Sequence, residues 1–152
     1  MQRVFDFAQS KEAAGYIDQR IIDYINECQS ESFESHETFD LLAFDFYDIR
    51  TDKSQSSKIL IYIDKKHLFF FCRDQVAHQY VKKILHELNA DGNIHNEQLL
   101  YLFFVKLLKG DMEYLDRFEN QINNEETQIL SGNKHNALAQ ICLWRKKLLR
   151  LK

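Results

Sequence analysis

The sequence of 152 residues contains no proline. An average composition of about 5% proline would have supplied roughly seven. Because proline is the residue that most often interrupts a helix, its absence permits long helices. Only four glycines are present, and no GxxxxGK[ST], GxGxxG or GxSxG motif occurs. The sequence therefore excludes the glycine-rich loops that bind nucleotide phosphates and the nucleophile elbow of many hydrolases.

Cysteine is also scarce. Cys28, Cys72 and Cys142 are odd in number, widely spaced and form no CxxC pair. This pattern argues against a disulfide framework or a zinc clip and favours a reducing compartment. We interpret all three as buried thiols.

Long hydrophobic runs and strong net charge are absent as well. The most apolar run, LLYLFFVKLL at 99–108, has ten residues and includes Lys106, whereas about 20 are needed to cross a bilayer. The N-terminus carries no secretory signal pattern. The net charge of -3 comes from 23 acidic and 20 basic residues spread along the chain, which does not favour nucleic acid as a partner. The chain is predicted to be soluble.

The composition, with 45% hydrophobic and 13% aromatic residues, is sufficient for a hydrophobic core. Residues 1–95 are predicted to form a small α/β layer domain. Ser10 is expected to cap a helix whose apolar positions are Ala14, Ile17, Ile21, Tyr24 and Cys28. The Ser- and Glu-rich segment 29–37 is expected to be a loop.

Three strands are predicted next, because β-branched and aromatic residues are dense in three successive runs. These runs are FDLLAFDFYDIR at 39–50, KILIYID at 58–64 and HLFFFCR at 67–73. The last two are expected to form a hairpin with its turn at Asp64 to His67. Asp74 should then cap a helix that buries Ala77, Tyr80 or Val81, Ile84 and Leu88 and ends around Gly92.

Residues 96–152 are predicted to form a helical arm: a long helix, a loop near 131–136 and the start of a second helix. In the long helix, an apolar seam of coiled-coil spacing runs through Met112, Leu115, Phe118, Ile122, Glu125 and Ile129. Gly110 is a place where this helix could bend. The predicted fold class is therefore α+β, resembling an α/β/α sandwich: a small mixed or antiparallel sheet flanked by helices and followed by a helical hairpin.

Three patterns invite a reading as metal or catalytic sites. HELNA at 86–90 begins like the zinc-protease motif HExxH, but Ala90 replaces the second histidine. ELNADGNIHNEQ at 87–98 imitates a calcium loop, but Glu87 replaces the first aspartate and Gln98 cannot provide the bidentate carboxylate. No local motif pairs any of the three cysteines with one of the six histidines (His36, His67, His78, His86, His95 and His135). We predict that the chain is not an enzyme and needs no cofactor to fold.

Two charged stretches have both a structural and a functional interpretation. ENQINNEE at 119–126 is interpreted as a solvated helix face rather than a cation site. WRKKLLRLK at 144–152 could be a helix for a membrane surface or target protein, or an ordinary bundle helix.

The order of these parts resembles the cytoplasmic domain of CorA-type magnesium and cobalt transporters. In that family a long helix reads "Y…LE.IE..I..LE..IL" and a second one "I..LRR.LL.LR". The long helix here matches at Leu99, Leu100, Tyr114, Leu115, Phe118, Glu119, Ile122, Glu125, Ile129 and Leu130. The second helix matches at Ile141, Trp144, Arg145, Lys146, Leu148, Leu149 and Arg150. The family signature Gly-Met-Asn is absent, and GDM at 110–112 is not that motif.

The resemblance implies that the chain is a fragment that ends before the stalk helix and the membrane helices. Such a fragment would lie on the cytoplasmic side of the membrane, would conduct no ions itself and would belong to a pentamer in the full-length protein. It would respond to Mg²⁺, as a regulatory ion, through carboxylates at subunit interfaces, and the motif assigns that role to no particular Asp or Glu. The alternative is a freestanding cytosolic interaction module whose helical hairpin docks a partner.

Overall fold

The structure is a computed structural model that describes residues 1–27, 31–46, 56–88, 94–130 and 137–149. The chain forms two compact units. The first contains Met1–Phe46 and Ser54–Lys106, and the second contains Leu107–Lys152. The predicted division into domains 1–95 and 96–152 stays a prediction.

A five-stranded mixed sheet organises the first unit. Its order is β1-β5-β4-β3-β2, and only the β1–β5 pair is parallel. The strands are β1 (Gln2–Asp6), β2 (Ser32–Ser35), β3 (Phe39–Phe46), β4 (Ser57–Asp64) and β5 (Leu68–Cys72). The predicted β4–β5 hairpin is confirmed, since the Asp64 amide donates to the His67 carbonyl at 2.9 Å.

One face of the sheet is covered by a 3-10 helix η1 (Phe7–Gly15) and by α1 (Gln19–Glu27). Side chains that alternate along the strands point to this face, where they meet Ile22 and Ile25 of α1. The strand residues in this core cluster are Phe5, Leu41, Ala43, Leu60, Tyr62, Phe69 and Phe71. Phe5 stacks on Phe71 at 5.3 Å between ring centroids, so the parallel strand β1 is held by side chains as well as by its ladder.

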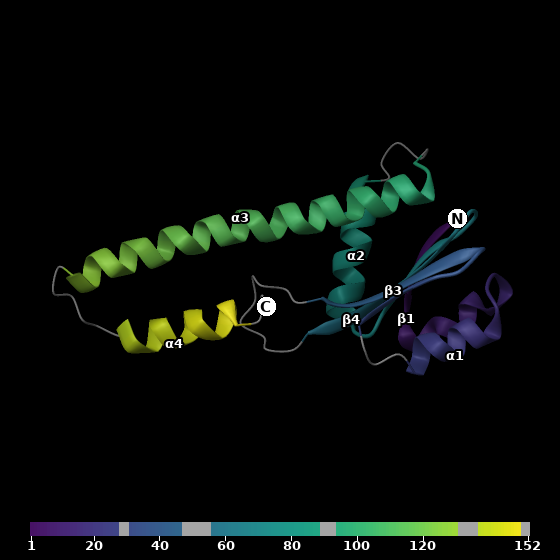
Figure 1. The fold of residues 1–152 in the computed structure, drawn as a ribbon, viewed down its shortest axis with the longest axis horizontal. Coiled ribbons are helices and arrows are strands. Elements are labelled where there is room, and N and C mark those ends of the chain that lie inside the picture. The colour runs from purple at the N-terminus through teal and green to yellow at the C-terminus, as the bar shows by residue number, and fades with distance from the viewer. Residues whose placement is uncertain (28–30, 47–55, 89–93, 131–136, 150–152) are drawn as a thin grey trace. The chain divides into compact units, whose positions relative to one another are not determined.

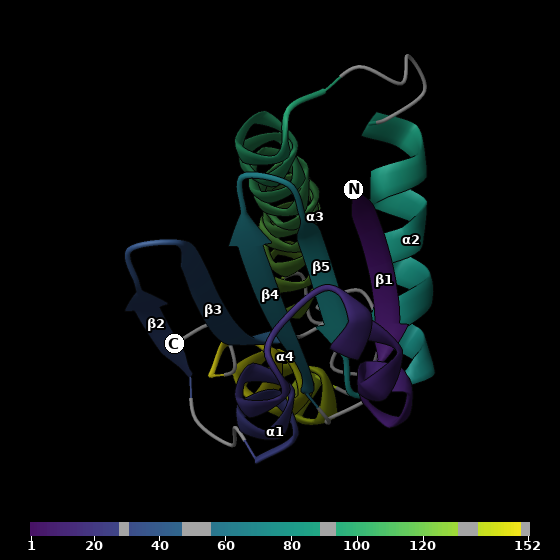
Figure 2. The same ribbon diagram turned by 90° about the vertical axis from the view of Figure 1, so that its right-hand side faces the viewer.

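The opposite face carries α2 (Gln75–Leu88) and the first turns of α3 (Asn96–Leu130). Phe70 packs on Phe103 of α3 at 4.9 Å, and Phe46 stacks on Tyr80 of α2 at 4.8 Å. Figures 1 and 2 show α1 and α2 on opposite sides of the sheet. The predicted fold class, α+β with an α/β/α arrangement and a long helix, is confirmed.

The cap predicted for α2 is also confirmed. The Asp74 carboxylate accepts hydrogen bonds from the amides of Val76 and Ala77, both at 3.0 Å. Among the residues expected on the buried side, Ala77, Val81 and Ile84 are buried, while Tyr80 and Leu88 are half-buried. The predicted end near Gly92 lies outside the described residues, and α2 ends at Leu88.

The helix predicted from Ser10 is wrong. Ser10 lies inside η1, where its buried hydroxyl donates to Asn26 Oδ1 at 3.0 Å, and Ala13 is buried in place of Ala14. The α-helix begins later, because Asp18 accepts from the Arg20 amide at 2.8 Å and so caps α1. Cys28 lies outside the described residues.

Two strands were not expected. The N-terminal residues form β1, which pairs with β5 in a register that joins positions 66 residues apart, such as Gln2 and Leu68. The segment predicted as a loop at 29–37 contains β2, which pairs with β3 through Ser32↔Ala43 to Ser35↔Asp40. The four residues of β2 pair because β3 offers a long hydrogen-bonding edge beside them. The predicted part of β3 at 47–50 lies outside the described residues.

Candidate functional site

The second unit presents a helical hairpin made of the C-terminal part of α3 and of α4 (Ala137–Leu148). The helix α3 continues through Gly110 and ends at Leu130, as a proline-free sequence permits. Phe118 is the buried centre of this hairpin, with 5% of its surface exposed. Its ring meets Trp144 of α4 edge-on at 6.2 Å and stacks on Tyr114 at 6.1 Å.

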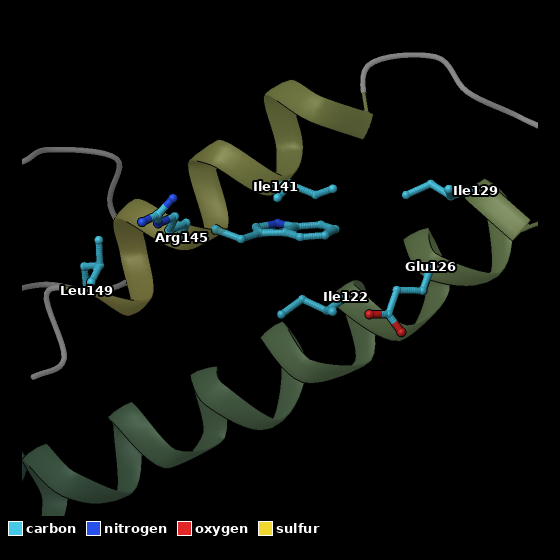
Figure 3. Close-up of a pocket in the computed structure, with 7 residues that line it drawn as sticks. Ile122, Glu126, Ile129, Ile141, Arg145 and Leu149 are labelled. Carbon is cyan, nitrogen blue, oxygen red and sulfur yellow. The ribbon is translucent and has the colours of Figure 1, made fainter.

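An apolar groove of about 450 Å³ lies between the two helices beyond this aromatic contact. Ile122 and Ile129 line it from α3, and Ile141, Trp144 and Leu149 line it from the α4 side. Figure 3 shows how both helices contribute side chains to the groove. Ile141 is 47% exposed and Leu149 is 57% exposed. The groove is thus an apolar surface that α3 and α4 leave uncovered between them.

Charged groups border this apolar surface. Glu126 lines the groove from α3 and Arg145 lines it from α4. A second cavity, of about 340 Å³, is polar and is lined by Gln121, Asn124, Glu125, Gln140 and, again, Trp144. The hairpin therefore offers an apolar strip with polar and charged groups at its margin, the pattern that an amphipathic helix recognises.

The predicted seam is only partly covered by α4. Phe118 is buried, Leu115, Ile122, Glu125 and Ile129 are half-buried, and Met112 is 59% exposed. Phe118, Ile122 and Ile129 contact or line the space next to α4. The coiled-coil geometry of this seam stays a prediction.

The zinc-like pattern at 86–90 and the calcium-like pattern at 87–98 were not expected to bind metal, and both lie only partly within the described residues. No group of three or more His, Cys, Asp or Glu that could hold a metal ion occurs there. His86 is exposed on α2, and most of the calcium-like loop, together with Ala90, lies outside the described residues. The Mg²⁺-sensing carboxylates implied by the resemblance remain unassigned.

Three of the histidines are paired with carboxylates. His67 Nδ1 donates to Asp64 at 2.9 Å, His36 Nε2 lies 3.4 Å from Glu34, and His78 Nδ1 hydrogen-bonds Asp6. The pair of His78 and Asp6 links α2 to β1 inside the first unit. It could not be predicted from the sequence, because 72 residues separate the partners. His135 lies outside the described residues.

The cysteines differ from one another. Cys72 is fully buried on β5, and burial together with the nearby negative charge of Asp6 and Asp74 raises the pKa of its thiol to about 12. It is a core thiol, as predicted. Cys142 is exposed on α4 and corrects the prediction that it is buried. The face of α4 that carries Trp144 turns toward α3, and Cys142 lies two residues before Trp144, on another face.

We expect a thiol reagent such as Ellman's reagent to modify Cys142 rapidly in the native protein and Cys72 only after unfolding. The reason is that burial denies the reagent access to Cys72 and keeps its thiol protonated at neutral pH. The measurement is the number of thiols titrated against time in a Cys28→Ser background, with and without denaturant. Equal rates at the two positions in the native protein would contradict the assignment.

Within the described residues, no helix is both long and apolar enough to span a membrane. By sequence comparison alone, no protein family and no curated protein matches the chain.

Solved structures do match by fold. Full-length CmaX superposes with a TM-score of 0.70 at 12% identity, over 95% of this chain and 47% of that one. The soluble domain of CorA from Methanocaldococcus jannaschii matches with a TM-score of 0.57 at 19% identity, over 78% of this chain and 48% of that one. The ZntB cytoplasmic domain from Vibrio parahaemolyticus RIMD 2210633 matches with a TM-score of 0.54 at 15% identity, over 77% of this chain and 49% of that one. The chain spans about half the length of each neighbour. It has the fold of the CorA-type N-terminal domain.

Proposed function

We propose that this chain is the cytoplasmic regulatory part of a CorA-like transporter for divalent cations such as Mg²⁺ or Co²⁺, and that it conducts no ions itself. The observation that carries the proposal is the fold shared with the soluble domain of CorA and the ZntB cytoplasmic domain. That likeness extends over more than three quarters of the chain. In this function the domain lies on the cytoplasmic side of the membrane.

The apolar groove between α3 and α4 gives the domain a means of communicating with the rest of a longer protein. Each neighbour is about twice as long as the matched region. In the proposed function a further amphipathic helix of the parent protein fills this groove, its apolar side on Ile122, Ile141 and Trp144 and its charged side near Glu126 and Arg145. A movement of α3 would then move that helix.

Regulation by Mg²⁺ follows from simple electrostatics in an oligomer such as the pentamer that we expect. Acidic surfaces brought together across a subunit interface repel each other, and a hard divalent cation held by carboxylates and water removes the repulsion. Loss of the ion would loosen the assembly and shift it toward an open state, with a coupling free energy of about 1–3 kcal/mol.

The alternative function is a freestanding cytosolic interaction module. The same groove favours it, because an uncovered apolar strip also suits a helix from a separate protein. The two functions differ in the parent reading frame: a transporter requires a long amphipathic helix and two apolar stretches of about 20 residues in addition to this domain.

The test of the proposed function is Mg²⁺ uptake by vesicles that contain the product of the complete reading frame, with and without cobalt hexaammine. We expect uptake that the inhibitor abolishes, and no uptake by vesicles mixed with the 152-residue chain alone. Transport no faster than in empty vesicles would refute the transport function and leave the interaction module.

Trp144 offers a direct probe of the hairpin, because it is the only tryptophan in the chain. We expect Phe118→Ala to shift the emission of Trp144 to longer wavelength, since the edge-on contact at 6.2 Å shields the indole from water. Such an aromatic contact is worth about 0.5–1.5 kcal/mol beyond its buried area. Leu108→Ala is the matched control, because Leu108 is 61% exposed on the same helix and should leave the emission unchanged. An unchanged spectrum in Phe118→Ala would contradict the described hairpin.

A further inference from the structure

The strand β2 forms one edge of the sheet. It is the last strand in the order, and within the described residues no other strand pairs with its outer side. Exposed edges usually carry lysine, proline or a bulge that prevents pairing with another chain. The sequence of β2, SFES, contains no lysine or proline, and Phe33 at its centre is 68% exposed. Its protection is limited to its length of four residues and to the charge of Glu34, which repels an acidic strand but attracts a basic one.

The two faces of β2 differ in chemistry. Tyr24 of α1 donates its hydroxyl to Glu34 at 2.6 Å and lies 3.2 Å from the Ser32 hydroxyl. Ser32 and Glu34 therefore face α1, and the alternation of a strand places Phe33 and Ser35 on the other face. A strand added to this edge would meet an acidic group on one face and an aromatic ring on the other.

A cavity of about 330 Å³ lies beside β2 on the side of α1. Ile21, Phe39 and Leu41 give it an apolar lining. Its polar lining comes from Tyr24, Glu34 and His36 and from Arg20, whose charge is offset by its ion pair with Asp18 at 3.1 Å. The rings of His36 and Phe39 stack at 4.4 Å, which fixes the turn between β2 and β3 together with the bond from the His36 amide to the Phe39 carbonyl. A long side chain with an apolar stem and a charged end fits this lining, the stem on the aliphatic groups and the end near Glu34.

The charge of the residues around β2 indicates whether the charged end of such a side chain should be positive or negative. Residues 21–46 contain seven acidic residues and no lysine or arginine. The acidic residues are Asp23, Glu27, Glu31, Glu34, Glu37, Asp40 and Asp45. Lys58 offsets one of them through its ion pair with Asp45 at 3.0 Å, and Arg20 pairs with Asp18, which lies outside this segment. The surface near β2 therefore attracts a positively charged partner.

We propose that the outer edge of β2 binds a basic, extended peptide segment of a partner protein, which adds to the sheet as a sixth strand. Backbone hydrogen bonds to β2 supply affinity, and alternate side chains supply specificity. A lysine or arginine on the side of α1 enters the cavity and pairs with Glu34. An apolar side chain on the opposite face packs on Phe33.

The first experiment is a titration of the 152-residue protein into a fluorescein-labelled peptide of alternating lysine and valine, followed by anisotropy. We expect saturable binding that weakens with salt. A peptide of alternating glutamate and valine should not bind. Two further peptides carry a methyl group on every second backbone nitrogen, one on the lysines and the other on the valines. Only one of these two sets of amides faces β2 and donates hydrogen bonds to it. Methylation of that set should abolish binding, and methylation of the other set should not.

Variants of the protein then locate the site. Glu34→Gln keeps an oxygen for the Tyr24 hydroxyl but removes the charge, and we expect about tenfold weaker binding. Phe33→Lys places a positive charge on β2, which repels the basic peptide and disfavours the pairing of another strand with this edge. It should reduce binding at least as much. Glu119→Gln and Tyr101→Ala are the matched controls, since Glu119 is exposed on α3 and Tyr101 is 67% exposed on the same helix. Circular dichroism checks that each variant is folded.

Two other outcomes would overturn the proposal. If both methylated peptides bind as well as the parent peptide, the attraction is purely electrostatic and no strand is added. If analytical ultracentrifugation shows dimers that Phe33→Lys dissociates, the occupant of the edge is a second copy of this chain. Neither outcome affects the transport assay, so the failure of this proposal is distinguishable from failure of the proposed function.

Discussion

Replacing Phe70 by alanine is expected to lower the free energy of unfolding by about 3–5 kcal/mol, the range for a fully buried phenylalanine. Phe70 is 0% exposed on β5, between β1 and β4, and its ring lies 4.9 Å from that of Phe103. Truncation would remove an aromatic contact between the sheet and the start of α3 and leave a cavity that rigid strands cannot close. Domains of this size are stabilised by about 5–15 kcal/mol in total. The variant should therefore be close to unfolding.

The measurement is urea unfolding followed by far-ultraviolet circular dichroism, for the wild type and for Phe70→Ala. Phe33→Ala is the matched control, because it removes the same side chain from the same sheet at a position that is 68% exposed. We expect Phe33→Ala to change the free energy of unfolding by no more than about 0.5 kcal/mol. Similar losses in the two variants would show that the assignment of the core is wrong.

The strands that could be predicted are those whose pairing is local. The β4–β5 hairpin was predicted because the apolar runs on both sides of DKKH are long and dense. The strand β1 could not be, because the five residues QRVFD form a strand only where β5 provides a parallel edge for them. The strand β2 was missed for a related reason. Its two serines and one glutamate have little intrinsic preference for strands, and pairing with β3 outweighs this low preference.

In the first helical segment, helical structure was predicted correctly but its boundaries were not. A single helix from Ser10 fits the recurrence of apolar residues, but the chain divides it into η1 and α1. The signal was available: Asp18 precedes the strongly amphipathic run QRIIDYINE and caps it through the Arg20 amide. Tyr16 and Ile17 instead close the turn, their amides both donating to the Ala13 carbonyl at 2.9 and 3.1 Å.

The candidate site was predictable as a surface but not as a groove. The spacing of Phe118, Ile122 and Ile129 indicates which side of α3 is apolar. Which of these residues α4 covers depends on the position along α3 at which Trp144 packs. That position is set by the tertiary structure and not by the local sequence. Trp144 contacts Phe118 at the beginning of the apolar run, so Ile122 and Ile129 are left to line the groove.

Substitution of Asp64 is the second prediction with a large expected effect. Its carboxylate, 18% exposed, accepts four hydrogen bonds in the β4–β5 turn. The donors are the Tyr62 hydroxyl at 2.8 Å, the amides of Lys66 and His67 at 2.6 Å each, and His67 Nδ1 at 2.9 Å. We expect Asp64→Ala to lower the free energy of unfolding by about 2–4 kcal/mol, because several of these donors lose their partner at once. Asp64→Asn keeps one oxygen acceptor and should lose less.

The position of the turn makes this loss more than local. The Asp64 carbonyl accepts from Asn96 Nδ2 at 3.3 Å, and Gln2 Nε2 donates to the Ile94 carbonyl at 3.2 Å. The β4–β5 turn, the first strand and the start of α3 are thus joined by hydrogen bonds at one end of the sheet. A disordered turn would weaken the attachment of α3 to the sheet, and protection of the Leu99 amide against hydrogen exchange should fall in Asp64→Ala.

Asp64 should also make stability depend on pH. Burial favours its neutral form, but the hydrogen bonds from His67, from the Lys66 amide and from Tyr62 outweigh burial and lower the pKa of the carboxyl below its ordinary value of 3.8. A group whose pKa is lower in the folded state contributes its stability fully at pH values above the ordinary pKa. The contribution is then lost as the pH falls through the folded value. Urea unfolding of wild type and Asp64→Asn between pH 2 and pH 5 measures it: the two curves should converge as the pH falls. A constant difference over that range would mean that the Asp64 carboxylate is not held by these bonds, and the turn would then owe its stability to the backbone and to packing alone.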